Sequence, residues 1–436
     1  MKKVLIITYY WPPAGGVQVH RVVKFCKYLR EYGWEPSILT VKGGTYDILD
    51  KSLAGEVEHI QDIYRAPALE PHHLFNLLTR SRKQHVETPG PSTPDSGNPR
   101  AWAHWLGEFI RLNVFIPDAR IGWHPYAVRR GKQVFLEKEP DLLFSTAPPY
   151  TVHLVARSLQ RRFATPWVAD FRDPWVENYA YNTTYRFPWI RSINQRMEYG
   201  VLRAADRVIT ATPGQLDLQA GKLQPSERHK FRTITNGYDS QGSQTPGKSD
   251  RFNLSYYGWI SAQRCPITLL RILRNLCQSD PQFSAQFTLR IIGRHDAQTA
   301  SILKKHIPDA NLDLRPPVPY DELQPMLYED QLMLVLVDQV PFNTLIITSK
   351  IFEIMPTGNP MLAIGPQEGD TARILRDTRT GVTFAPQTEA GLTDYILDQF
   401  VQWKRGKLNT GPRSFPAYER RNLVGELADV FNQLTA

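Results

Sequence analysis

VLIITYYWPPAGGVQVHRVVKFCKYLREYGWEPSILTV, residues 4–41, is the stretch that decides the fold. It begins with a short, continuously apolar run at residues 4–8 and passes into a loop rich in proline and glycine. The apolar residues that follow recur at helical spacing: Val19, Val22, Val23, Cys26 and Leu29. Gly33 supplies a helix C-cap, and residues 38–41 form the next apolar run. We therefore predict a strand–helix–strand unit here.

The same alternation continues along the chain as two series of apolar runs. The first series continues at residues 141–145, 167–170, 207–211 and 232–235. The second occupies residues 254–257, 287–292, 312–315, 332–337 and 361–364. Runs that are apolar throughout are typical of parallel strands covered on both faces. The sequence thus predicts an α/β fold with two Rossmann-like, doubly wound parallel-sheet domains facing a cleft.

A polar, turn-rich stretch at residues 241–249 is typical of a linker and predicts a boundary near residue 245. The predicted N-terminal domain is 1–245, and the predicted C-terminal domain is 246–412. Residues 413–436 end in a predicted helix whose apolar positions suit packing back on the N-terminal domain. Within the first domain, residues 82–100 have little apolar content and predict a mobile insertion.

Length and composition are those of a soluble two-domain protein. At 436 residues the chain exceeds the size at which one core keeps growing, and no apolar run reaches bilayer-spanning length. The three cysteines have no spacing typical of a disulfide framework or zinc site, which fits a reducing cytosol. The net charge of +9 attracts phosphates, nucleic acid or an anionic membrane surface without choosing among them.

The loop after the first predicted strand contains two glycines, Gly15 and Gly16. It lies at the carboxyl edge of the sheet, where open α/β sheets bind ligands. Glycine lets the backbone approach an anion at the helix N-terminus, where free N–H groups favour negative charge. The alternative is a tight turn without a ligand, since no G-x-G-x-x-G pattern is present.

Polar residues follow two further strands of the first domain at the same edge. Thr146 follows one strand, and Asp170, Arg172 and Asp173 follow the next. They are candidates to bind sugar hydroxyls or a phosphate, and the alternative is a structural ion-pair network. His153, early in a predicted helix, is a further substrate-side candidate, although a lone histidine there is more often structural.

The second domain carries its own candidates. Gly258 lies at a strand end and Arg264 follows in the same loop, where an arginine can neutralise a diphosphate. The alternative is an exposed loop arginine. Ser349, Lys350 and Glu353 open a predicted helix. A capping box does not explain the glutamate, although an early glutamate also stabilises a helix dipole for structural reasons.

The order of these motifs resembles that of the retaining glycosyltransferases of family 4, which have the GT-B fold. The matches run along nearly the whole chain: IPD at 116–118 with Trp123, STAPP at 145–149, DFRDPW at 170–175, NGYD at 236–239, the loop 258–264, SKIFE at 349–353 and GNP at 358–360. Singly these motifs are weak, but their order is specific. The resemblance implies an acceptor-side N-terminal domain and a C-terminal domain that binds a nucleotide sugar.

The resemblance also implies residue roles. Donor-binding positions are Gly15, Gly16, Gly258 and Ser349. Arg264 and Lys350 would meet the diphosphate, and Glu353 would hold the donor ribose. Substrate-side positions are Thr146, His153, Asp170, Arg172 and Asp173. A nucleotide-diphosphate sugar is then the co-substrate, with no metal and no other cofactor.

Two positions depart from the family pattern. The family often has an arginine directly after the glycine of the loop at 258, and Trp259 stands there. Its paired glutamates lie eight residues apart, and the position eight before Glu353 is Leu345. The second departure removes the usual contact to the donor sugar. A non-catalytic sugar-nucleotide-binding or scaffold protein of the same fold is therefore the alternative hypothesis.

Residues 101–111 predict an amphipathic helix with several aromatic residues on one face. Such a helix can lie in a bilayer interface, helped by basic pairs such as Arg129-Arg130 and Arg161-Arg162. The alternative is that the helix packs its apolar face on the first domain. Cytoplasmic localisation, with peripheral binding to the inner face of the membrane, is the expectation.

The resemblance implies a hexosyltransferase-like enzyme that moves a sugar to a glycan or lipid-linked acceptor in cell-surface polysaccharide synthesis. A sugar-nucleotide epimerase on the same fold would also use a diphosphate cradle. Nucleic-acid binding rests on the net charge alone, with no recognition motif, and is not expected.

Overall fold

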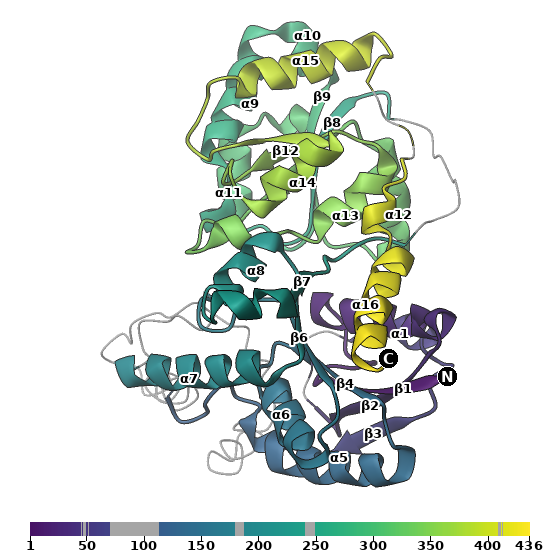
Figure 1. Cartoon of the computed structure of the whole chain (residues 1–436). Helices are drawn as coiled ribbons and strands as arrows, with labels where there is room; N and C mark the ends of the chain where they lie inside the picture. The colour runs from purple at the N-terminus through teal and green to yellow at the C-terminus, as the bar shows by residue number, and fades with distance from the viewer. Residues whose placement is uncertain are drawn as a thin grey trace, which may run out of the picture. The chain divides into compact units, whose positions relative to one another are not determined.

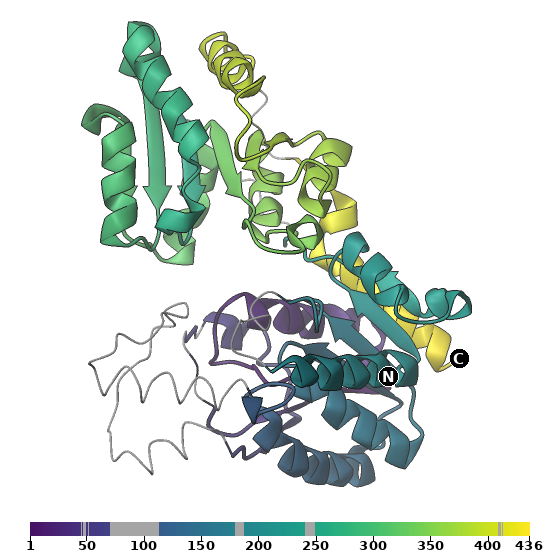
Figure 2. The same cartoon turned by 90° about the vertical axis from the view of Figure 1, so that its left-hand side faces the viewer.

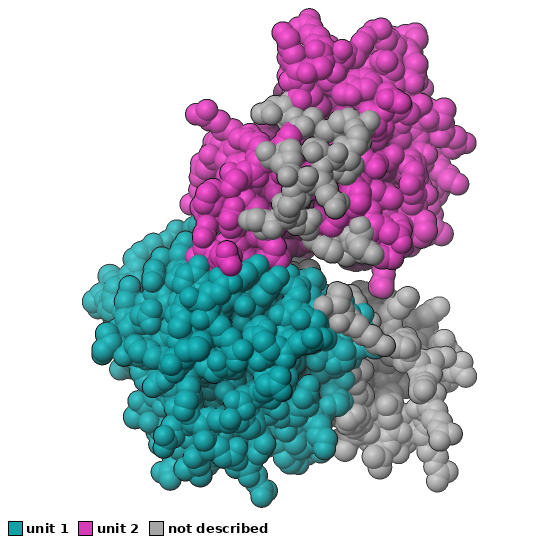
Figure 3. Space-filling model, turned by 90° about the vertical axis from the view of Figure 1, so that its right-hand side faces the viewer, with its two compact units in different colours: residues 1–235, 423–436 teal, residues 236–422 magenta. Residues whose placement is uncertain are grey.

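The computed structural model describes residues 1–44, 46, 49–50, 52–69, 113–178, 187–239, 249–408, 411 and 413–436. The chain divides into two compact units, shown in Figure 3. Unit 1 is Met1–Thr235 with Leu423–Ala436, and unit 2 is Asn236–Asn422. The insertion predicted at 82–100, the helix predicted at 101–111 and nearly all of the predicted linker lie outside the described residues.

Unit 1 is built on a parallel sheet with the strand order β3-β2-β1-β4-β5-β6-β7 (Figure 1). The strands are β1 (Lys2–Ile7), β2 (Trp34–Val41), β3 (Ile63–Ala66), β4 (Leu142–Ala147), β5 (Trp167–Phe171), β6 (Arg207–Thr210) and β7 (Phe231–Thr233). The central strand β1 pairs with β2 and β4, so that Ile6 lies opposite Ile38 and Phe144. The prediction of a buried parallel sheet is confirmed.

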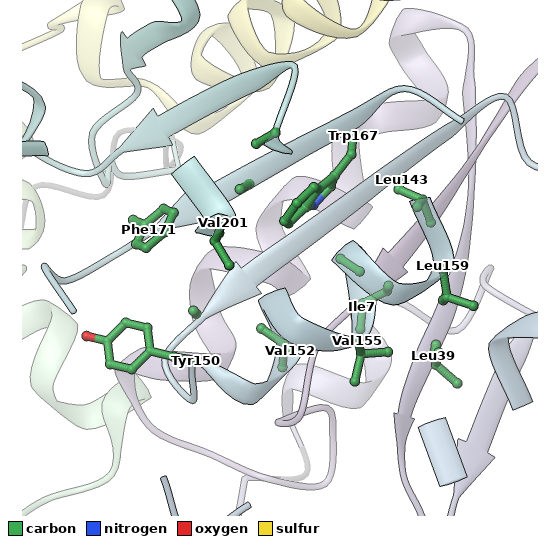
Figure 4. Close-up of a cluster of buried hydrophobic side chains, with 14 of the residues drawn as sticks. Ile7, Leu39, Leu143, Tyr150, Val152, Val155, Leu159, Trp167, Phe171 and Val201 are labelled. Carbon is green, nitrogen blue, oxygen red and sulfur yellow. The ribbon is translucent and has the colours of Figure 1, made fainter. Parts of the chain in front are cut away.

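Helices cover both faces of this sheet because alternate residues of each strand point to opposite sides. Leu5 and Ile7 of β1 belong to one apolar cluster, drawn in Figure 4, whereas Val4 and Ile6 belong to another. The helices of unit 1 are α1 (Val17–Leu29), α2 (Ser52–Gly55), α5 (His124–Lys138), α6 (Thr151–Phe163), α7 (Pro188–Ala204), α8 (Pro213–Ala220) and α16 (Arg420–Leu434).

Helix α16 contributes the C-terminal residues to the core of unit 1. Its apolar face packs in the same cluster as Val4 and Ile6. The ring of Phe431 lies 5.2 Å from that of Trp34 and 5.6 Å from that of Phe144, both centroid to centroid. The final segment therefore belongs to the same hydrophobic core as the first strand.

Unit 2 is built on a second parallel sheet, with the strand order β10-β9-β8-β11-β12-β13. The strands are β8 (Phe252–Tyr257), β9 (Phe287–Ile292), β10 (Leu312–Arg315), β11 (Leu332–Leu336), β12 (Met361–Ile364) and β13 (Gly381–Phe384). Alternate residues again enter two clusters, with Leu334 in one and Met333 and Val335 in the other. Both units are thus α/β domains in which strand order reverses once about the first strand.

The helices of unit 2 lie on both sides of its sheet (Figure 2). They are α9 (Ile267–Ser279), α10 (Pro281–Gln286), α11 (Ala297–His306), α12 (Tyr320–Glu329), α13 (Lys350–Ile354), α14 (Asp370–Thr378) and α15 (Leu392–Lys404). Single turns of 3-10 helix complete the two units at η1 (Arg30–Tyr32), η2 (Ile121–Trp123), η3 (Pro225–Lys230), η4 (Ala262–Arg264), η5 (Asp309–Asn311), η6 (Asn343–Leu345), η7 (Met355–Thr357) and η8 (Pro416–Tyr418).

The division between the units differs from the boundary expected near residue 245 and from the last segment expected at 413–436. It falls after Thr235, and the return to unit 1 falls at Leu423. The reason is that Tyr238 exchanges backbone hydrogen bonds with η8 and the start of α16, donating to Tyr418 at 3.0 Å and accepting from Arg420 at 2.9 Å. These pairings hold both segments in unit 2.

Among the described residues, no helix combines the length and apolar content needed to cross a membrane.

Candidate functional site

The order of the strands reverses between β1 and β4 in unit 1, and between β8 and β11 in unit 2. Loops that leave the carboxyl ends of two such strands diverge to opposite faces of the sheet. The crevice between them is where open α/β sheets bind ligands. Side chains in the loops after these four strands are therefore the first candidates for a site.

In unit 2, two glycines bring a lysine close to the backbone at the end of β8. Gly258 has a φ of +123°, and its N–H donates to the carbonyl of Ile292 at 2.9 Å. A Cβ on Gly293, directly after β9, would lie 1.9 Å from the carbonyl oxygen of Gly258. A Cβ on Gly258 would lie 2.9 Å from Cε of Lys350. Any larger residue at either position would displace the loop or the lysine.

The ammonium group of Lys350 is a positive charge that is not paired with an anion of any described residue. Its Nζ lies 5.1 Å from the centroid of the Tyr256 ring. It makes no hydrogen bond or ion pair with any residue that the structure describes. Burial and the neighbouring Arg264 lower the pKa of Lys350, while Glu353 and Asp338 oppose that shift. A desolvated cation of this kind is stabilised by an incoming anion such as a phosphate.

Arg264 connects the loops on the two sides of the same reversal point. Its Nε lies 2.5 Å from Oδ1 of Asp338, which follows β11. Its Nη1 donates to the carbonyl of Trp259 at 3.1 Å, and the guanidinium lies 5.7 Å from the centroid of that residue's ring. The side chain is only 19% exposed, so it is not a free loop arginine. Its geometry is fixed before any ligand arrives.

Glu353 presents a carboxylate that no described residue hydrogen-bonds. Burial raises its pKa, while Lys350 and Arg420 oppose the shift. Ser349 precedes α13 but makes no capping hydrogen bond with its side chain. The helix macrodipole is a sum over aligned peptides, and α13 has only five residues, so its dipole is small. The side chains of Lys350 and Glu353 therefore supply most of the charge at this place.

The two positions that depart from the family pattern lie in the loops after β8 and β11. Trp259 is 57% exposed beside Arg264. Leu345 closes η6 and is half-buried. Neither side chain can bind a sugar hydroxyl as a carboxylate or guanidinium would.

In unit 1, the loop after β1 leads to a helix whose N-terminus has no side-chain cap. Gly16 is the N-cap of α1 and has a φ of +89°, which favours glycine. Gly15, half-exposed, precedes it. The loop packs on buried Tyr9, whose ring contacts that of Trp123 edge to face, with the two centroids 5.5 Å apart. This geometry leaves the anion-binding role of Gly15 and Gly16 as a prediction.

Asp170 and Thr146 belong to a buried ion-pair network. Arg21 donates to Oδ1 of Asp170 at 2.8 Å and to Oδ2 at 3.2 Å, and Oγ1 of Thr146 donates to Oδ2 at 2.6 Å. Arg21 also donates to the carbonyls of Ile234 and Thr235 at 2.8 and 2.9 Å. The Asp170 carboxylate is fully buried and occupied by the protein. This arrangement is the ion-pair network of the structural alternative, and the substrate-side role of Asp170 and Thr146 stays a prediction.

Arg172 is also bonded to the protein, through three backbone carbonyls. It donates to Ala147 at 3.1 Å, to Pro148 and to Gln18. It therefore ties the loop after β4 to the first turn of α1, across the reversal point of unit 1. Among the carboxylates predicted for the substrate side, Asp173 is exposed and Asp170 is not.

His153 is completely buried on α6. Its Nδ1 lies 2.8 Å from Oγ of Ser145, which accepts the indole N–H of Trp167 at 2.8 Å. Its Nε2 is buried and makes no hydrogen bond with a described residue. Burial, with a contribution from Arg172, lowers the pKa of His153 to about 3. The ring is therefore neutral and lies within the core beside Phe171.

Burial of a neutral histidine predicts a specific loss of stability in acid. Below a pH of about 6.5 the unfolded chain binds a proton at this position and the folded chain does not, until the pH approaches 3. Between pH 7 and 5 the free energy of unfolding of unit 1 should therefore fall by about 2 kcal/mol through His153 alone.

In urea titrations, His153→Asn, which keeps a group able to bond Ser145, should lose this component. His229→Asn, at an exposed histidine, should keep it. An identical pH dependence in His153→Asn and wild type would contradict the assignment.

Several residues of these sites carry no signal in the sequence. Arg21 is 149 residues from its partner Asp170. Asp338 and Tyr256 are ordinary residues beside predicted strands until the fold places them against Arg264 and Lys350. Asp118 belongs to the recognised IPD motif, and its carboxylate caps α6 by accepting from the N–H and hydroxyl of Thr151 at 2.9 and 2.8 Å.

The chain was compared with known families and proteins. A sequence model described as "Glycosyl transferase 4-like domain" matches residues 15–237. No curated protein sequence matches the chain. Among the part of the chain that the structure describes, no group of His, Cys, Asp or Glu side chains is placed to hold a metal ion.

Several solved structures share the fold along their whole length. Sucrose-phosphate synthase from Thermosynechococcus elongatus is 14% identical with a TM-score of 0.58, covering 100% of this chain and 98% of that one. The N-terminal domain of Candida albicans trehalose-6-phosphate phosphatase is 13% identical, with a TM-score of 0.61 and coverage of 100% and 97%. WaaG, a glycosyltransferase involved in lipopolysaccharide biosynthesis, is 12% identical, with a TM-score of 0.52 and coverage of 98% and 99%. At these identities the likeness shows the fold, which is GT-B.

Proposed function

This chain belongs to the family of glycosyl transferase 4-like domains, and from that premise we propose that it is a retaining glycosyltransferase. The donor would be a nucleotide-diphosphate sugar, and the acceptor a glycan or lipid-linked molecule in cell-surface polysaccharide synthesis. One observation carries the proposal. The ammonium of Lys350 lies against Gly258 at the reversal point of unit 2, and no described residue supplies an anion to it.

The chemistry of sugar transfer calls for positive charge at this place. Departure of a nucleoside diphosphate leaves an oxocarbenium-like sugar and puts new negative charge on the leaving oxygen. Preorganised cations stabilise that charge without reorganising during the reaction. Lys350 would meet the diphosphate as a point charge, and Arg264, held by Asp338, would meet it with planar donors. Backbone N–H groups near Gly258 would add to this cradle.

Glu353 would hold the two ribose hydroxyls of the donor. The Glu353 carboxylate accepts no hydrogen bond from a described residue and lies near Lys350. It can therefore accept hydrogen bonds from the two ribose hydroxyls, since the ribose is attached to the diphosphate that Lys350 would meet. The acceptor would bind to unit 1, where Asp173 and the loop at Gly15 and Gly16 are the exposed candidates at the carboxyl edge.

Replacing the carboxylate of Glu353 tests its role in donor binding. Hydrogen bonds to a charged group contribute roughly 1.5–3 kcal/mol, so Glu353→Gln should raise the donor KM by about 10- to 100-fold. The acceptor KM should stay within about twofold of the wild-type value, because the substitution removes contacts to the donor and none to the acceptor. Glu389→Gln on the surface of unit 2 is the matched control. An unchanged donor KM in the Glu353 variant would remove this residue from the site.

The proposed activity is tested by release of nucleoside diphosphate from a panel of sugar nucleotides, with thermal shift as the binding assay. Bound donor should raise the Tm, and turnover should require an acceptor. Retention would be read from the anomeric configuration of the product. Neither stabilisation nor turnover with any donor would overturn the proposal.

A second candidate is a non-catalytic sugar-nucleotide-binding protein, favoured by Leu345 and Trp259 at positions where the family places charged residues. It predicts a Tm shift with donor and no turnover with any acceptor. A sugar-nucleotide epimerase would instead convert the donor without an acceptor. Product analysis in the absence of acceptor separates these activities.

A further inference from the structure

Helix α7 of unit 1 has two chemically different faces. Its buried residues follow one stripe: Ile190, Asn194, Glu198, Val201 and Leu202. Its exposed residues recur every three or four positions along the opposite side: Trp189, Ser192, Arg196, Tyr199 and Arg203. At 1.5 Å per residue the 17-residue helix is about 26 Å long. Figure 1 shows its whole length at the side of unit 1.

An exposed aromatic pair stands at the start of this helix. Phe187 is 43% exposed and Trp189 is 54% exposed, yet their rings stack with centroids 5.9 Å apart and planes 12° apart. The N–H of Phe187 donates to Oδ1 of Asn113 at 3.0 Å, next to Val114, which is 66% exposed. Tyr199 lies about three turns further along the same helix and is 43% exposed. Contiguous exposed apolar side chains, such as this stacked pair, mark interaction surfaces.

The charges on the exposed side of α7 are all of one sign. Arg196 and Arg203 are exposed, and neither forms an ion pair with a described residue. The one carboxylate in the helix sequence, Glu198, is 1% exposed and bonded to Lys222. Other exposed arginines of unit 1 differ, since Arg228 is paired with Asp217. The arginines on α7 are therefore available to an external anion.

We propose that the α7 face, made of Phe187, Trp189, Ser192, Arg196, Tyr199 and Arg203, lies on the surface of an anionic lipid bilayer. Aromatic rings with polar atoms settle at the headgroup level of a bilayer, and arginines beside them bind lipid phosphates. A second copy of this chain is a poor occupant, because a twofold contact would bring like-charged arginines together. The proposal does not depend on the sugar-transfer activity, because docking needs no turnover.

Vesicle flotation of the full chain tests the proposal directly. It should bind vesicles of phosphatidylcholine mixed with phosphatidylglycerol, bind more weakly in high salt and bind phosphatidylcholine alone poorly. Arg196→Glu with Arg203→Glu should weaken binding by about 30-fold or more, the loss expected for two arginine contacts. Phe187→Ser with Trp189→Ser should reduce binding without changing its salt dependence.

Matched variants make the result specific to α7. Arg65→Glu with Lys132→Glu, at exposed positions of β3 and α5, makes the same charge change elsewhere on unit 1 and should leave binding unaltered. A polarity-sensitive dye at Ser192→Cys should brighten with anionic vesicles, whereas the same dye at Ser226→Cys on η3 should not. The natural cysteines are buried, so labelling is selective.

Three outcomes would overturn the proposal. One is absence of binding to anionic vesicles at low salt. Another is equal loss of binding in the control and α7 charge variants, which would assign binding to net charge. The third is a dimer in solution that the Phe187 and Trp189 substitutions dissociate, which would make the face a protein interface. Urea titrations of each variant confirm that unit 1 remains folded.

Discussion

Replacing Arg264 by alanine is expected to lower kcat by about 100- to 1,000-fold, while the acceptor KM changes by less than about twofold. One well-aimed donor to a developing negative charge contributes roughly 3–4 kcal/mol in the transition state. Arg264 is suited to this because Asp338 and the carbonyl of Trp259 fix its guanidinium before the donor binds. The charge it meets grows as the glycosidic bond breaks, so the loss should fall on kcat. Steady-state kinetics with the donor identified by the panel would measure it.

Two further variants separate this effect from a change in folding. Arg271→Ala removes an arginine from an exposed ion pair with Glu389 in the same unit and should leave kcat within about twofold. Asp338→Asn keeps Arg264 but releases its anchor, and should lower kcat less than the loss of the arginine itself. If Arg264→Ala retained the wild-type kcat with the wild-type Tm, the arginine would have no place in the mechanism.

Replacing Asp170 by asparagine is expected to destabilise unit 1 by roughly 3–5 kcal/mol, the usual cost of leaving one partner of a buried ion pair unpaired. Arg21 would keep its bonds to the carbonyls of Ile234 and Thr235 but would lose its counter-charge in a fully buried setting. Urea titration followed by near-ultraviolet circular dichroism reports on this unit, because Trp34, Trp123, Trp167 and Trp175 are buried in it.

The matched control is Asp217→Asn, which removes the exposed partner of Arg228 on the same unit and should cost less than about 1 kcal/mol. A destabilisation by Asp170→Asn as small as that of the control would show that the buried pair contributes little. Retained stability with lost activity would return Asp170 to the list of substrate-binding residues.

The central strands could be predicted from the sequence because they are apolar throughout. The edge strands β3 and β13 were missed. Their sequences, IYRA and GVTF, are short, and an exposed residue interrupts each apolar run. An edge strand has one neighbour and less cover, so it needs less apolar sequence. The domain boundary was displaced for another reason: the pairing of Tyr238 with the segment near Arg420 is invisible to local composition.

The sequence predicts individual residues of the candidate site, but it does not predict which side chains pair with one another. Loop positions such as Gly258, Arg264 and Lys350 follow from the rule that ligands bind at the carboxyl edge of the sheet. Which polar residues at that edge remain free depends on contacts made across the sheet. Asp170 and Asp173 belong to the same sequence motif, yet Asp170 is the one whose carboxylate forms an ion pair with Arg21. Long-range pairing of this kind decides between a structural and a binding role.

Because α16 supplies part of the unit 1 core, it determines when unit 1 can finish folding during synthesis. Domains usually fold in the order of their synthesis. Unit 2, residues 236–422, is fully synthesised before Leu423–Ala436, which supply part of the core around Val4 and Ile6. Unit 1 is thus completed after unit 2, because its core stays open at the α16 position until residues 423–436 have been synthesised. Loss of the final turns during synthesis would leave a finished unit 2 attached to an incomplete unit 1, the kind of product that cellular quality control removes.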